Sequence, residues 1–88
     1  MSMKDLIRIT RTVRRYRQVV RKLEGHFGPT TRLDEIDREK AAKFKAKLAK
    51  TLEPTTVAKN LAVAKLLFGE LVDQERIGRN PFAKIRTY

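Results

Sequence analysis

The residues near the amino end have the types and spacing of a surface that binds phosphate. The candidates between positions 11 and 22 are Arg11, Arg14, Arg15, Gln18, Arg21 and Lys22. Guanidinium forks bridge phosphate oxygens or bind O6 and N7 of guanine, and a glutamine amide can pair with adenine. From Lys4 to Glu24 the only acidic residues are Asp5 and Glu24, so these cations have few carboxylates to pair with. The pattern favours contact with a polyanion over a solvated helix face held by intrahelical ion pairs.

A second set of cations with helical spacing lies in the middle of the chain. It consists of Lys40, Lys43, Lys47 and Lys50. Asp37 and Glu39 are close in sequence, so this spacing fits a contact surface and a solvated face equally well.

The charge balance of the whole chain points to the same kind of partner. The 88 residues carry a formal net charge of +11. A surplus of this size on a small domain indicates nucleic acid or an anionic membrane surface, and we expect nucleic acid. Apolar residues make up 41% of the chain, which is too many for a disordered tail.

Residue type excludes several other kinds of site. The chain has no cysteine, so it can form neither a disulfide nor a thiolate metal site, and a cytoplasmic protein is expected. His26 is a lone histidine without partners for a metal, so we expect no metal and no other cofactor. No apolar run approaches the roughly 20 residues that span a bilayer, and we expect no membrane partner.

The cations near the amino end must be positioned by a helix. The apolar residues of this stretch recur at steps of three and four: Leu6, Ile9, Val13, Tyr16, Val20 and Leu23. This spacing predicts a helix over about residues 4–24, with Gly25 as its C-cap. β-Branched residues before position 12 leave a break possible there, with Thr10 or Thr12 capping a later start.

The middle of the chain predicts a second helix over about residues 38–50. Asp37 is a good N-cap for it, because a carboxylate accepts from the free N–H groups of the first turn. This helix would bury Ala41, Phe44 and Leu48. In the loop before it, Leu33 and Ile36 are expected to enter the core.

A third long helix and a short last one complete the expected fold. Pro54 suits the first position of a helix over about residues 54–75. Its core stripe would be Val57, Leu61, Ala64, Phe68, Leu71 and Val72. Asn80 and Pro81 predict the start of a short helix over about residues 81–86. The expected fold is therefore all-α, a compact bundle of three main helices and one short C-terminal helix in a single domain.

Four short motifs follow one another in an order that a known family shares. Residues 12–16 (TVRRY) look like a first DNA-facing helix, and residues 33–37 (LDEID) look like the entry to a middle helix. Residues 56–57 (TV) open the long helix, and residues 77–82 (IGRNPF) follow it. This order resembles the core-binding, SAM-like domain of tyrosine recombinases of the phage-integrase family. That family usually has another full helix before the first motif, and here only residues 1–11 precede it.

The resemblance implies a domain that grips duplex DNA without catalysing strand exchange itself. In the family the third helix also enters the major groove, which adds four candidate contacts: Thr55, Thr56, Lys59 and Lys65. The implied partners are double-stranded DNA, a catalytic recombinase domain and neighbouring protomers. The implied location is the nucleoid of a bacterial cytoplasm, and the parent protein would be a longer recombinase. We expect no catalytic residue here, and Tyr88 lacks the paired arginines that a recombinase nucleophile requires.

Two other classes of function fit the composition. An RNA-binding helical bundle would bind duplex RNA as well as duplex DNA, although an A-form groove excludes helices. A module for membrane surfaces or for another protein would bind liposomes or a partner without any dependence on nucleic acid.

Overall fold

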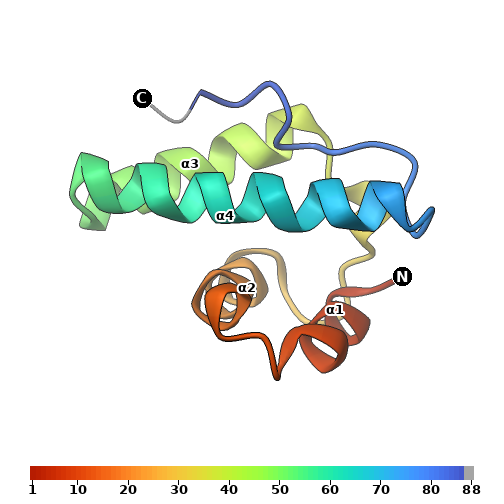
Figure 1. Cartoon of the computed structure of the whole chain (residues 1–88). Coiled ribbons are helices and arrows are strands. Elements are labelled where there is room, and N and C mark those ends of the chain that lie inside the picture. The colour runs from red at the N-terminus through yellow and green to blue at the C-terminus, as the bar shows by residue number, and fades with distance from the viewer. Residues whose placement is uncertain (87–88) are drawn as a thin grey trace.

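Four α-helices make up the fold of the computed structural model, which describes residues 1–86. They are α1 (Met3–Thr10), α2 (Arg14–Phe27), α3 (Arg38–Thr51) and α4 (Pro54–Asp73), and a short 3-10 helix, η1 (Leu33–Glu35), precedes α3. No β-strand occurs in the described residues, so the all-α prediction is confirmed. Figure 1 shows α4 crossing the middle of the molecule, with α3 on one side and α1 and α2 on the other.

The stretch predicted as one helix over about residues 4–24 is two helices, so the single helix is wrong, and the break that the sequence left open near position 12 is what forms. A turn at residues 11–12 separates them, and the next residue, Val13, has an extended backbone with φ −98° and ψ 103°. Val13 is the N-cap of α2 and makes no side-chain cap bond, so neither threonine has the expected capping role. The hydroxyl of Thr10 instead donates to the Leu6 carbonyl at 2.6 Å. The break allows α1 to fold back and pack against α2.

Helix α2 also runs past its expected end. Gly25 lies inside the helix, and Gly28 ends it with a φ of +94°, where glycine has no Cβ to strain the backbone. The extra residues bring the rings of His26 and Phe27 to 5.5 and 5.9 Å from the ring of Phe44, between centroids. This contact with α3 favours the longer helix over an end at Gly25.

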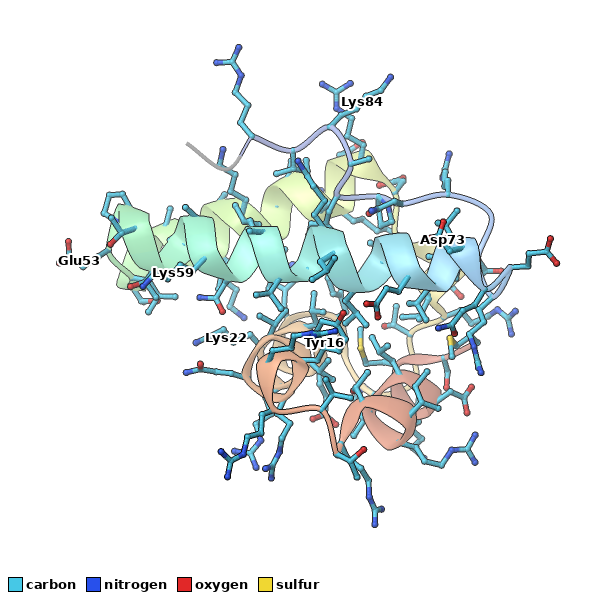
Figure 2. All side chains as sticks on the ribbon, viewed as in Figure 1. Tyr16, Lys22, Glu53, Lys59, Asp73 and Lys84 are labelled. Atoms are coloured by element: carbon cyan, nitrogen blue, oxygen red, sulfur yellow. The ribbon has the colours of Figure 1, made fainter. Side chains whose placement is uncertain are left out.

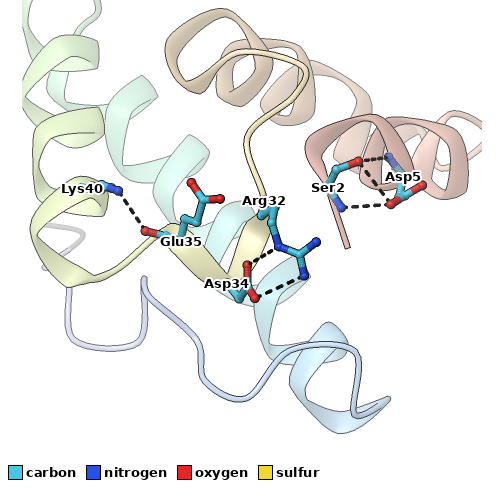
Figure 3. Close-up of polar contacts among 6 residues, drawn as sticks. All are labelled: Ser2, Asp5, Arg32, Asp34, Glu35 and Lys40. Carbon is cyan, nitrogen blue, oxygen red and sulfur yellow. Dashed lines mark hydrogen bonds and ion pairs between the residues drawn. The ribbon is translucent and has the colours of Figure 1, made fainter.

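A capping box begins α1. The backbone N–H of Ser2 donates to Oδ2 of Asp5 at 2.9 Å, and the backbone N–H of Asp5 donates to the Ser2 hydroxyl at 3.4 Å (Figure 3). The bond from the Ser2 backbone, followed by that of its hydroxyl, lowers the pKa of Asp5. The box satisfies N–H groups that the first turn leaves free.

The amino terminus is also tied to the loop after α2. The backbone N–H of Met3 donates to the carbonyl of Thr31 at 2.8 Å, and the N–H of Leu33 donates to the carbonyl of Met1 at 2.9 Å. These bonds flank an antiparallel bridge between residues 2 and 32. The first residues therefore lie against residues 31–33, although some thirty positions separate them in sequence.

Helices α3 and α4 begin where the sequence predicts. Oδ1 of Asp37 accepts from the backbone N–H of Lys40 at 2.9 Å, and Pro54 occupies the first turn of α4. The three apolar residues expected to be buried on α3, and both residues expected to enter the core from the preceding loop, are buried. The stripe predicted on α4 is buried except for the half-buried Val72. Beside it Leu67 is buried, whereas Leu66 is 51% exposed.

The short helix expected over residues 81–86 does not form, and residues 81–84 make turns instead. The side chain of Asn80 holds this segment: its Oδ1 accepts from the Phe82 N–H at 3.0 Å, and its Nδ2 donates to the Lys65 carbonyl of α4 at 2.9 Å. The ring of Phe82 is fully buried, 5.1 Å from that of Phe68 between centroids. The segment is thus fixed by contacts with α4, which replace the hydrogen bonds of a helix.

Candidate nucleic-acid interface

The polar residues predicted on α2 all lie on its outer face. Tyr16, Val19, Val20 and Leu23 are buried, and the helical period turns the residues between them outward. We call this outer face the α2 surface, and it consists of Arg14, Arg15, Arg17, Gln18, Arg21 and Lys22. All are exposed except the half-buried Lys22. Arg17 was not among the predicted contacts, although its spacing of four residues from Arg21 was a usable signal.

Most cations of the α2 surface have no anionic partner. In residues 1–86, Arg14, Arg17, Arg21 and Lys22 take part in no ion pair. Cations elsewhere do pair, for example Arg32 with Asp34 at 3.2 Å (Figure 3). The α2 surface can therefore meet a polyanion without first giving up an ion pair at these four positions.

The turn before α2 adds Arg11 to this region. Arg11, Arg17 and Arg21 line a shallow hollow between α1 and α2, and Glu24 is its one acidic residue. Ile7, Thr10 and Val20 complete its walls. The break in the predicted helix thus leaves Arg11 near the α2 surface.

The four residues predicted on α4 are not all in one place. Thr55, Thr56 and Lys59 are exposed in its first two turns. Figure 2 shows Lys22 of α2 and Lys59 of α4 projecting toward the same end of the molecule. Lys65 is half-buried, and its carbonyl accepts from Asn80, so it lies on the side of the C-terminal segment.

Arg15 differs from its neighbours because it is paired. Its Nη2 lies 3.5 Å from Oε1 of Glu70 on α4 and 3.5 Å from the hydroxyl oxygen of Tyr16. Its guanidinium carbon lies 4.9 Å from the centroid of the Tyr16 ring. The hydrogen bond to Tyr16, and to a smaller extent the charge of Glu70, raise the pKa of Arg15. These three residues link α2 to α4.

Helix α3 forms a second basic surface, and it carries more cations than the four lysines predicted there. It carries six cations and one acid, whereas α2 carries five cations and one acid. Lys43 pairs with Glu39 at 3.5 Å, and Nζ of Lys40 donates to the Glu35 carbonyl at 3.1 Å (Figure 3). Part of the predicted lysine row on α3 is therefore held by local contacts.

His26 and Tyr88 are the other residues considered for chemistry in the sequence. His26 packs against Phe27 and Phe44, and burial followed by the charge of Lys47 lowers its pKa. No cluster of three potential metal ligands occurs in residues 1–86. No helix in this part of the chain is long and apolar enough to cross a bilayer. Tyr88, the residue expected not to be a nucleophile, lies outside the described residues.

Fold and surface together define a small all-helical domain with a strongly basic outer face. A family model for the phage integrase SAM-like domain matches residues 2–87, and the chain belongs to this family. The family is the SAM-like part of phage integrases and not their catalytic domain. No curated protein and no solved structure gave a significant match. The resemblance drawn from the sequence motifs is confirmed, and α1 is a short helix in the place before the TVRRY motif where the resemblance implied a full one.

Proposed function

We propose that this chain is the DNA-binding module of a site-specific tyrosine recombinase and grips duplex DNA through the α2 surface. The observation that carries the proposal is the row of exposed α2 cations without anionic partners in residues 1–86. Such cations bind DNA phosphates with release of condensed counterions, which supplies most of the affinity. Groove contacts from Gln18 or the first turns of α4 would add a modest sequence preference.

In this function the module acts together with other parts of a recombinase. The SAM-like family is not the catalytic domain, so strand cleavage and joining fall to a separate catalytic recombinase domain. Neighbouring protomers on the same DNA site are the second class of partner. The location that follows is the bacterial nucleoid.

The test compares two charge reversals that change net charge equally. The α2 variant carries Arg14→Glu and Lys22→Glu, and the α3 variant carries Lys43→Glu and Lys47→Glu. We expect the α2 variant to lose about tenfold or more in affinity for a short DNA duplex, because each lost phosphate contact becomes a repulsion. The α3 variant should lose less, since Lys43 is already paired with Glu39.

Fluorescence anisotropy at several salt concentrations gives the affinities. With about four to six phosphates neutralised, log affinity should fall with log salt at a slope of about −4 to −5. All four substituted side chains are on the surface, so each variant should stay within about 1 kcal/mol of the wild-type stability. Equal losses in the two variants would show that the protein acts only as a diffuse polycation. Equal affinity for duplex RNA would favour an RNA-binding bundle instead.

A further inference from the structure

Arg15 is the one cation of the α2 surface that meets a carboxylate in residues 1–86. Its Nη2 is 3.5 Å from Oε1 of Glu70 and 3.5 Å from the Tyr16 hydroxyl oxygen. The side chains of Arg15 and Glu70 are 62% and 40% exposed, whereas Tyr16 is 3% exposed. The buried Tyr16 thus holds one side of the Arg15 guanidinium, whereas the contact between Arg15 and Glu70 is open to solvent.

The chemistry of this arrangement is that of an anion site. A carboxylate and a phosphodiester each offer two oxygens that share negative charge, and a guanidinium fork matches both. Tyrosine hydroxyls and arginines are both ordinary donors to DNA phosphates. The position of the Glu70 carboxylate therefore shows where an anion can sit against Arg15.

We propose that Arg15 and the Tyr16 hydroxyl form a binding site for a backbone phosphate of duplex DNA, and that Glu70 occupies this site in the free protein. This inference rests on the proposed function and names one site within it. The phosphate displaces the Glu70 carboxylate, while the guanidinium stays against the Tyr16 ring. No covalent step is involved.

Two features make the exchange favourable. An ion pair between exposed side chains is weak, so Glu70 can be displaced at small cost. Burial, followed by contact with Glu70, raises the pKa of Tyr16, so its hydroxyl keeps its proton and can donate to a phosphate at neutral pH. Nη2 carries two hydrogens and lies 3.5 Å from both the Tyr16 hydroxyl oxygen and Oε1 of Glu70, so a phosphate that also uses Nη2 takes the place of Glu70.

The first experiment asks whether Arg15 contacts a phosphate. Arg15→Gln should reduce the magnitude of the salt slope by about 0.9, the value for one phosphate contact on a DNA duplex. The matched control is Arg32→Gln, which removes the same charge and another exposed ion pair, that with Asp34, from the loop before α3. Arg32→Gln should leave the slope unchanged. An unchanged slope in Arg15→Gln would overturn the site, because Arg15 would then remain with Glu70 in the complex.

The second experiment asks whether Glu70 competes for the site. Glu70→Gln and Asp73→Asn each remove one negative charge from α4, and Asp73 takes part in no ion pair in residues 1–86. At fixed salt, Glu70→Gln should raise duplex affinity about two- to fivefold more than Asp73→Asn does, because only Glu70 must be displaced. Equal gains would contradict the competition.

These outcomes distinguish a failure of the proposed phosphate site from a failure of the proposed function. If wild type binds duplex DNA with a steep salt slope and the α2 charge reversal weakens it, the proposed function holds. If Arg15→Gln then behaves like Arg32→Gln, only the phosphate site is wrong. If wild type shows no salt-dependent binding to the duplex, both proposals are wrong.

Discussion

Among single residues, His26 shows how a side chain outside the α2 surface responds to its surroundings. It packs against the rings of Phe27 and Phe44, and burial followed by the charge of Lys47 lowers its pKa below the ordinary value of 6.5. The fold therefore favours the neutral imidazole. As pH falls below 6.5 the unfolded chain takes up the proton first, so the stability contributed by His26 above that pH is lost as pH falls through the lower pKa of the folded state.

The prediction is that wild type loses more stability between about pH 7.5 and pH 5 than His26→Phe, which keeps a ring but cannot titrate. Urea unfolding at the two pH values measures the difference. Lys47→Gln should raise the NMR pKa of His26, whereas Lys50→Gln, from the same row of lysines, serves as the control. A pKa of 6.5 or above for His26 in the folded wild type would contradict this account.

At the scale of helices, the ends that side chains determine locally could be predicted. Asp37 and Pro54 act on the turn that they begin, so the starts of α3 and α4 follow from the sequence. The apolar steps of three and four continue across the break before α2, so the β-branched residues before position 12 were its only local signal, and they did not determine which residue would begin the second helix. Both Gly25 and Gly28 suit a helix end, and the choice depends on ring contacts with α3.

The same distinction between local spacing and contacts across helices applies to the candidate site. The outward positions of the α2 cations follow from helical spacing, since the buried residues of α2 fix its inner face. The pairing of Arg15 with Glu70 could not be predicted, because it depends on where α4 crosses α2. The same holds for Asn80, which was expected to begin a helix and instead joins the C-terminal segment to Lys65 of α4.

The role of Asn80 can be measured. Asn80→Ala removes two hydrogen bonds, to the Lys65 carbonyl and from the Phe82 N–H, and should lower the free energy of unfolding by about 1–3 kcal/mol. Gln74→Ala is the control, because in residues 1–86 the Gln74 side chain accepts only an exposed bond from Arg76, and the substitution should cost less than about 0.5 kcal/mol. Both values come from urea unfolding. Equal losses would mean that Asn80 does not hold the segment.

For the molecule as a whole, the large positive charge opposes folding. A net charge of +11 is confined to a body measuring 31 × 24 × 21 Å, and most of it lies on α2 and α3. Self-repulsion of this kind destabilises a compact state, and salt screens it, with a Debye length near 10 Å at about 0.1 M.

Salt should therefore act on folding and on binding in opposite directions. Between about 10 and 200 mM NaCl the melting temperature should rise while duplex affinity falls. The α3 charge reversal lowers the net positive charge, so its melting temperature should rise less over the same range. Differential scanning calorimetry supplies this comparison. A melting temperature that falls with added salt in wild type would show that ion pairs outweigh the repulsion.

The bridge between the amino terminus and residues 31–33 also has a consequence for the order of folding. Helix α2 can form from contacts between near neighbours, but the bonds of Met3 and Leu33 need both ends of a loop of some thirty residues to meet. Closing such a loop costs chain entropy before any bond forms. The backbone groups of Thr31 and Leu33 that bond to the amino terminus reach their positions only after the chain has turned at Gly28. We therefore expect α1, the first helix in the sequence, to be the last to reach its place.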